Sequence, residues 1–213
     1  MRECLDAVAY KKVERVMAAL KRNNMNAYFV ENEKEALEKV KTFLSYEYKI
    51  GVGGSVTLSE IGLIDELRSG KYEFIDTLNP TLSNNERHKL YRECFFSDVY
   101  FCSSNAITED GKLYNVDGRS NRVAAMLYGP NKVVFVVGTN KIVSTLDDAI
   151  KRNKEISAPA NALRLNKKTP CAKTLVCKDC DSPERICRNF IVMGPQFDKE
   201  RVHVIIVNKS LGY

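Results

Sequence analysis

The stretch DVYFCSSNAITEDGKLYNVDGRSNRVAAMLYGPNKVVFVVG, residues 98–138, decides the fold class. It opens with an apolar strand candidate at 98–103 and closes with another at 132–138, and a helix candidate at 120–129 lies between them. Strands joined through a helix favour a right-handed crossover between parallel neighbours, with helices covering both faces of the sheet. This segment therefore predicts an α/β protein.

The same alternation of strands and helices extends over most of the chain. Further strands are expected at 27–30, 48–52, 72–76 and 202–207, and further helices at 6–23, 31–44, 57–70, 83–95 and 144–157. Between 158 and 195 the alternation stops, because prolines, lysines and four cysteines replace the periodic pattern. We expect one domain spanning 1–213, with 158–195 as a cysteine-rich excursion before the last strand.

Composition narrows the class of protein. With 44% hydrophobic and 28% charged residues, the chain has the make-up of a soluble globular protein. The net charge of +6 is spread along the chain without a dense basic block, which argues against nucleic acid as the main partner. The longest apolar runs, 133–137 and 202–207, are strand-sized, and the amino terminus has no secretory pattern. We expect a cytoplasmic protein without a membrane span.

The segment 50–63, IGVGGSVTLSEIGL, is the first candidate binding element. A strand that runs through glycines into a helix lets a ligand approach the backbone, and the free amides at a helix start favour anions. The pattern is neither a dinucleotide fingerprint nor a P-loop, so no nucleotide cofactor is inferred. The alternative is that the glycines only permit a tight turn. Candidate ligand-binding residues here are Gly53, Gly54, Ser55, Thr57 and Glu60.

A predicted hairpin supplies the second candidate element. Asp110-Gly111 lies between short strand candidates in the segment 108–118, which is a strong signature of a tight turn. An insertion after a parallel strand lies on the edge where α/β proteins bind ligands. Amides, carboxylates and an arginine suit a polar, anionic ligand, although Asp110 is also explained as a turn former. Candidate ligand-binding residues here are Asn105, Asp110, Asn115 and Arg122.

Four cysteines follow in the segment 171–187, CAKTLVCKDCDSPERIC. Thiols stay reduced in the cytosol, and this polar stretch offers no apolar core in which to bury them as packing residues. We therefore expect a metal site, either an iron–sulfur cluster or zinc, while a redox dithiol at Cys177 and Cys180 remains an alternative. The expected ligands are Cys171, Cys177, Cys180 and Cys187.

Three segments, GVGGSVTLSEIGL, SSNAITEDGKLYNVDGRSNRVAAMLYGPNKVVFVVGTNKIV and APANALRL, together resemble the LUD domain, or lactate-utilisation protein family. That family is similar to the NagB/RpiA/CoA-transferase-like group. The resemblance implies a three-layer α/β/α fold and an accessory role in lactate oxidation, alongside the subunits of an iron–sulfur oxidoreductase complex. It assigns no reaction or catalytic residue to this chain.

Two other functional classes stay open. One is a stand-alone enzyme of the sugar-phosphate isomerase or CoA-transferase type, with Glu60 or Asp110 as the acid, base or nucleophile. The other is a regulatory or assembly module without catalysis. For a shared binding site, the strands at 48–52 and 97–102 must be neighbours, so that Ser55 and Asn105 open into one pocket.

Overall fold

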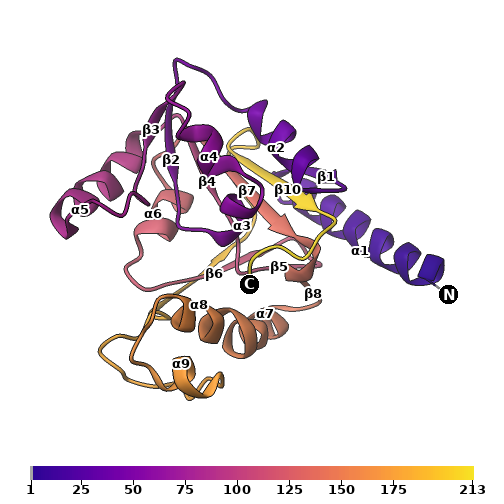
Figure 1. Ribbon diagram of the computed structural model, residues 1–213. Helices are drawn as coiled ribbons and strands as arrows, with labels where there is room; N and C mark the ends of the chain where they lie inside the picture. Colours follow the sequence, from indigo (N-terminus) through magenta and orange to yellow (C-terminus); the bar gives the residue numbers. More distant parts are fainter. Residues whose placement is uncertain (1) are drawn as a thin grey trace.

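The computed structural model describes residues 2–213, with side chains described from residue 4 onward. Its main sheet has six strands, and every neighbouring pair is parallel (Figure 1). In spatial order the strands are β1 (Asn26–Val30), β10 (Val202–Val207), β7 (Lys132–Gly138), β4 (Val99–Cys102), β2 (Lys49–Val52) and β3 (Glu73–Ile75). The predicted α/β class and parallel sheet are confirmed.

Helices cover both faces of this sheet because its central strands are apolar on both sides. Along β7, Val134 and Val136 face one core and Val133 and Phe135 face the other. The helices α2 (Glu33–Lys41), α3 (Val56–Glu60) and α4 (Leu63–Leu67) pack on the first side, and α1 (Arg2–Arg22), α5 (Asn84–Glu93) and α6 (Asn121–Leu127) on the second. The result is the expected three-layer α/β/α arrangement.

The predicted hairpin is confirmed, and it belongs to a second sheet. The strands β5 (Ala106–Thr108) and β6 (Leu113–Asp117) pair antiparallel. At the turn, Gly111 has φ +80°, and a Cβ there would lie 2.7 Å from a backbone atom of Ala19. Only glycine satisfies both conditions, so the turn packs directly on α1.

Two strands that the sequence pattern did not reveal complete this second sheet. They are β8 (Ile142–Val143), parallel to β5, and β9 (Asn189–Met193), antiparallel to β6. The strand β9 lies inside the segment 158–195, which we expected to be irregular. That segment also holds α8 (Ala158–Arg164) and α9 (Pro170–Thr174). The excursion is therefore an organised part of the domain.

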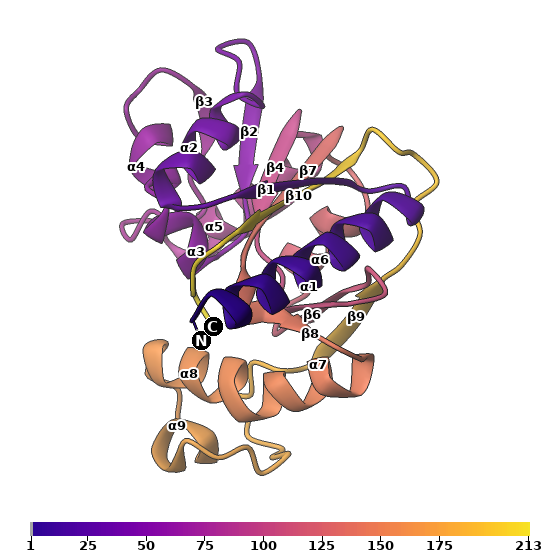
Figure 2. The same cartoon turned by 90° about the vertical axis from the view of Figure 1, so that its right-hand side faces the viewer.

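The helix expected at 144–157 continues further than the pattern indicated. It begins as α7 (Leu146–Arg152) with a capping box between Thr145 and Asp148, passes through a π-helical turn at Asn153–Ser157, and runs into α8. Figures 1 and 2 show α7, α8 and α9 grouped at one end of the molecule, beside the second sheet.

The single helix expected at 57–70 is two short helices. Gly62, with φ +77°, separates α3 from α4, since a left-handed residue interrupts the regular hydrogen-bond ladder. Gly70, with φ +84°, follows α4 in the predicted left-handed position. In the described part of the chain, residues 2–213, every helix is too short or too polar to cross a bilayer.

Candidate functional site

A cavity of about 660 Å³ opens at the carboxyl ends of β2 and β4. These strands are direct neighbours, with Gly51 paired to Tyr100, which confirms the arrangement expected for a shared site. Ser55, which follows β2, and Asn105, which follows β4, both line the cavity. The glycine loop and the hairpin therefore meet in one pocket, at the sheet edge where parallel α/β folds bind ligands.

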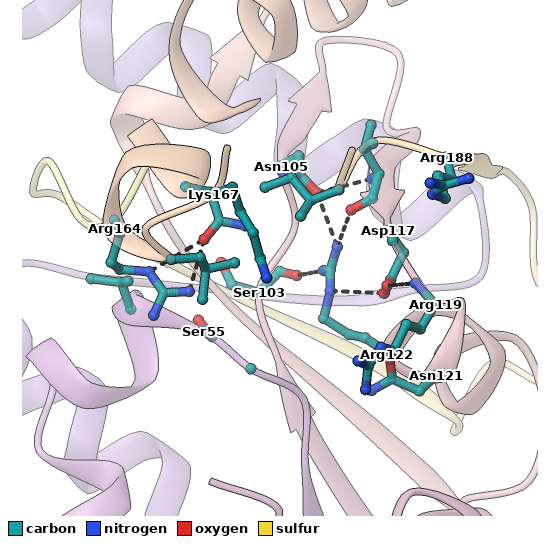
Figure 3. Close-up of a pocket in the computed structure, with 18 of the residues that line it drawn as sticks. Ser55, Ser103, Asn105, Asp117, Arg119, Asn121, Arg122, Arg164, Lys167 and Arg188 are labelled. Atoms are coloured by element: carbon teal, nitrogen blue, oxygen red, sulfur yellow. Dashed lines mark hydrogen bonds and ion pairs between the residues drawn. The ribbon is translucent and has the colours of Figure 1, made fainter. Parts of the chain in front are cut away.

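The lining of the cavity carries a large excess of positive charge. Two carboxylates, Asp117 and Glu184, face it. Figure 3 shows Arg164 and Lys167 on one side and Arg119, Arg122 and Arg188 on the other. All the basic lining residues are Arg87, Arg119, Arg122, Lys141, Arg164, Lys167, Arg185 and Arg188. Half-enclosed cationic surfaces of this kind attract carboxylate and phosphate groups.

Arg122 is the hub of a network that joins the hairpin to α6. Its guanidinium donates to the backbone oxygens of Ser103 and Val116, to Oδ1 of Asn115 and to Oδ1 of Asn105, at 2.9 to 3.1 Å. Its Nε lies 3.5 Å from Oδ2 of Asp117 (Figure 3). Four N–H groups thus donate to protein acceptors, which leaves neither terminal nitrogen free for a bidentate contact to a ligand, and the Nε–Asp117 contact is an ion pair without a hydrogen bond. Arg122 contributes positive charge and shape to the cavity.

Two residues behind the wall of the cavity depend on this network. Asn115 is fully buried, and its amide nitrogen has no hydrogen-bond partner within residues 2–213. Gly53 lies so close to Arg122 that a Cβ would sit 2.7 Å from Cγ of the arginine and 2.8 Å from the hydroxyl of Tyr100. Neither residue lines the cavity, but both fix the position of the arginine that does.

The glycine loop leads into a shorter helix than the sequence suggested. The helix that follows it, α3, is one short turn of five residues. Ser55 caps that turn by accepting from the amide of Leu58, and Thr57 Oγ1 accepts from Lys141. The positive charge of the cavity therefore comes from side chains, while Gly54, Ser55 and Thr57 form one wall.

Besides Gly53 and Asn115, two more of the predicted site residues lie outside the cavity lining. Glu60 is exposed and accepts a hydrogen bond from the backbone amide of Gly212 at 2.7 Å. Asp110 sits at the tip of the hairpin, where it pairs with Lys112 at 2.6 Å and accepts from Thr108. Both carboxylates have local structural roles, as the turn explanation anticipated for Asp110.

Lys141 is a lining residue that we did not select from the sequence. It ends the short 3₁₀ turn Thr139–Lys141 after β7, and only 3% of the residue is exposed. Its Nζ donates to the hydroxyls of Thr57 and Ser103 at 3.0 Å each. Burial, reinforced by the positive charges of Arg152 and Arg122, lowers the pKa of Lys141 to about 7.

The cysteine loop borders the same cavity. Arg185 lines the cavity and also donates to the backbone oxygens of Cys180 and Cys187, at 2.8 Å each. Cys171 is buried, with its sulfur 3.3 Å from Oγ1 of Thr169, and Cys177 lies beside Asp179. Burial raises the pKa of the Cys187 thiol, against the opposing effect of Arg185. The loop thus lines the cavity through Pro183, Glu184, Arg185 and Ile186.

The four cysteines do not form a closed ligand set in this arrangement. Across residues 2–213, no three Cys, His, Asp or Glu side chains converge closely enough to hold a metal ion. Tetrahedral thiolate sites need four sulfurs within about 2.3 Å of one centre. Metal binding here stays a prediction, and it requires the loop to close around the ion.

Several functional side chains were missed because they lie in the segment that the pattern described as irregular. Arg164 reaches the cavity from the end of α8, Lys167 from the segment after it, and Arg188 from the residue before β9. A usable signal existed only for Lys141, which follows the carboxyl end of an apolar strand as Asn105 does.

Comparisons with known proteins give one family match and a similar solved structure. The family model described as the LUD domain matches residues 13–207. A solved structure, a DUF162 family protein from Deinococcus radiodurans, superposes with a TM-score of 0.56 at 13% sequence identity. The match covers 93% of this chain and 98% of that protein, and at this identity it shows the fold alone. No curated protein matches the chain.

Proposed function

The chain belongs to the LUD domain family, and from that premise we propose that it is a lactate-utilisation-type protein whose cavity binds a small anionic ligand. The observation that carries the proposal is the charge of the lining, seven arginine and lysine residues besides the buried Lys141, against two carboxylates. Those carboxylates are already engaged, Asp117 with Arg122 and Glu184 with the backbone amide of Lys168. A ligand with carboxylate or phosphate groups would balance the excess positive charge.

Direct contacts to that ligand would come from donors that the protein leaves free. Within residues 4–213, Lys167 Nζ lines the cavity and has no hydrogen-bond or ion-pair partner. Arg119 uses one guanidinium nitrogen on His88 and its backbone amide on Asp117. Each hydrogen bond from a charged donor of this kind to the ligand contributes about 1.5–3 kcal/mol to binding.

Binding in an accessory role is favoured over a stand-alone isomerase or transferase. The enzyme alternative assigned acid–base or nucleophilic chemistry to Glu60 or Asp110, and neither carboxylate lines the cavity. The two carboxylates that do line it are held by Arg122 and Lys168. A carboxyl group can act as a general acid or base only within reach of the ligand.

Neutralising a free cation in the cavity should weaken binding at least tenfold. Titration calorimetry against lactate, a sugar phosphate and a CoA ester identifies the ligand class, and Lys167→Met then removes one direct donor. The loss of one charged hydrogen bond predicts this size of effect. Raising the salt concentration should weaken the wild-type interaction as well, because the cavity is open to solvent.

Lys71→Met is the matched control, because Lys71 is exposed and remote from the lining residues. The control should bind as tightly as the wild type. If all three ligand types fail to bind the wild-type protein, or if the Lys71 variant loses as much affinity as the Lys167 variant, the cavity is not an anion site.

We further propose that the loop 171–187 binds a metal centre, with iron–sulfur ahead of zinc because of the family's link to lactate oxidation. Four thiols in a polar loop support the proposal, as does the guanidinium of Arg185, which would offset the charge of thiolates. A bound cluster would supply electron transfer within an oxidoreductase assembly, and zinc would supply structural order.

Anaerobically purified protein should therefore carry a metal, with a visible absorption band if the centre is iron–sulfur. Cys177→Ser should lose most of that metal, since each ligand contributes to closing the loop. Cys4→Ser, at an exposed position in α1, should keep it. Colourless protein with near-stoichiometric zinc would exclude the cluster, and metal-free protein with four freely reactive thiols would exclude the site altogether.

A further inference from the structure

Lys141 is a buried amine without a counter-ion. In the part of the chain from residue 4 to 213, no carboxylate oxygen lies within 4.0 Å of its Nζ. Its partners are two hydroxyls, those of Thr57 and Ser103. Structural lysines that are buried this deeply are normally paired with an acid, because an unpaired buried ammonium is costly. The surroundings of Lys141 favour the neutral amine instead.

The positive charges around Lys141 also lower its pKa. Arg152 approaches from α7 and Arg122 from α6, and both disfavour a third positive charge. Glu60 of α3 is the one acid that acts on the lysine, and it lies on the solvent side, bound to the amide of Gly212. With a pKa lowered to about 7, the amine is largely neutral, and hence nucleophilic, at physiological pH.

The position of Lys141 places this amine at the cavity where the proposed ligand would bind. It lines the cavity together with Ser55, Asn105 and Arg122, so a bound anion would lie in the same space. We infer that Lys141 is a nucleophile that forms an imine with the carbonyl group of an anionic oxo acid or aldehyde phosphate bound in the cavity. This inference rests on the proposed anion binding and names the ligand class more narrowly.

The step is redox-neutral and uses only groups that are present. The lone pair of Nζ attacks the carbonyl carbon and forms the C–N bond, giving a carbinolamine. The amine gives up its protons, the carbonyl oxygen gains two and leaves as water, and a C=N bond remains. The hydroxyls of Thr57 and Ser103, each 3.0 Å from Nζ, can accept and return a proton during this exchange.

Reductive trapping tests the inference on the intact protein. Glyoxylate and glyceraldehyde 3-phosphate are added separately with cyanoborohydride at pH 7.4, and the site of the secondary amine is mapped by mass spectrometry. About 0.1% of an ordinary lysine is neutral at this pH, whereas a pKa lowered to about 7 leaves a far larger share of Lys141 neutral. We expect labelling of Lys141 at least tenfold above that of any other lysine.

Two variants and one binding measurement separate the outcomes. Lys141→Arg keeps a long basic side chain but cannot form an imine, so labelling at position 141 should vanish, while Lys71→Arg should be labelled at Lys141 like the wild type. Even labelling of many lysines, or an unchanged adduct in Lys141→Arg, overturns the inference. If calorimetry shows that glyceraldehyde 3-phosphate binds and no Lys141 adduct forms, the nucleophile is excluded and anion binding stands. If neither probe binds or labels, the imine falls, and the titrations with lactate, a sugar phosphate and a CoA ester decide whether anion binding falls as well.

Discussion

Arg122→Leu should lower the free energy of unfolding by about 3–5 kcal/mol, the usual result of removing one partner from a buried ion pair. Only 12% of the Arg122 side chain is exposed, and 10% of that of Asp117. The leucine would leave the Asp117 carboxylate unpaired, together with the side-chain oxygens of Asn105 and Asn115. Urea denaturation measures the loss.

Arg122→Lys provides the matched comparison. Lysine keeps the positive charge but offers three donors from a single atom, which cannot reach five acceptors arranged around a planar guanidinium. We expect an intermediate loss of about 1–2 kcal/mol. If both variants were as stable as the wild type, Arg122 would not be the structural hub of the site, and its donors would be free for a ligand after all.

The sequence was sufficient for the main sheet because its central strands are apolar along their whole length. Runs such as 132–138 are typical of parallel strands that are covered on both faces, and the helices between them follow from periodicity. The position of the pocket followed as well, since parallel strands place their carboxyl ends on one edge. Ser55 and Asn105 meet there as expected.

The second sheet could not be predicted in the same way, because its strands depend on contacts between distant segments. The strand β9 is five residues long and exposes Phe190 and Val192, so its pattern is not that of a core strand. It forms only because β6 offers an antiparallel edge. For this reason the sequence analysis missed the cavity residues that the segment 158–195 contributes.

The structural role of Arg122 could not be predicted from the sequence either. An arginine near a predicted pocket suggests a ligand anchor, since a guanidinium suits bidentate contacts with anions. In the folded protein its guanidinium faces acceptors from the segment after β4 and from β6 of the hairpin. Whether an arginine binds a ligand or the protein depends on how many acceptors surround it, and that number is a property of the tertiary structure.

The second prediction concerns the glycine loop and compares substitutions at two adjacent residues, Gly54 and Gly53. Gly54→Phe should abolish anion binding with little loss of stability. Gly54 is exposed at the cavity wall, and a Cβ there meets only Cδ2 of Leu78, at 4.0 Å, so the backbone accepts a side chain. The phenyl ring would then occupy space that the ligand needs. Calorimetry should show at least a hundredfold weaker binding, alongside a nearly unchanged urea midpoint.

Gly53→Ala should show the reverse pattern, because the constraint at Gly53 is internal. The added methyl group would overlap Cγ of Arg122, which its hydrogen bonds hold in place, and the hydroxyl of the buried Tyr100. Overpacking of this kind costs about 1–3 kcal/mol. Gly54→Ala should change neither property much. If Gly54→Phe bound the ligand normally, the anion would lie elsewhere in the cavity; if Gly53→Ala were fully stable, the arginine network would be looser than its geometry indicates.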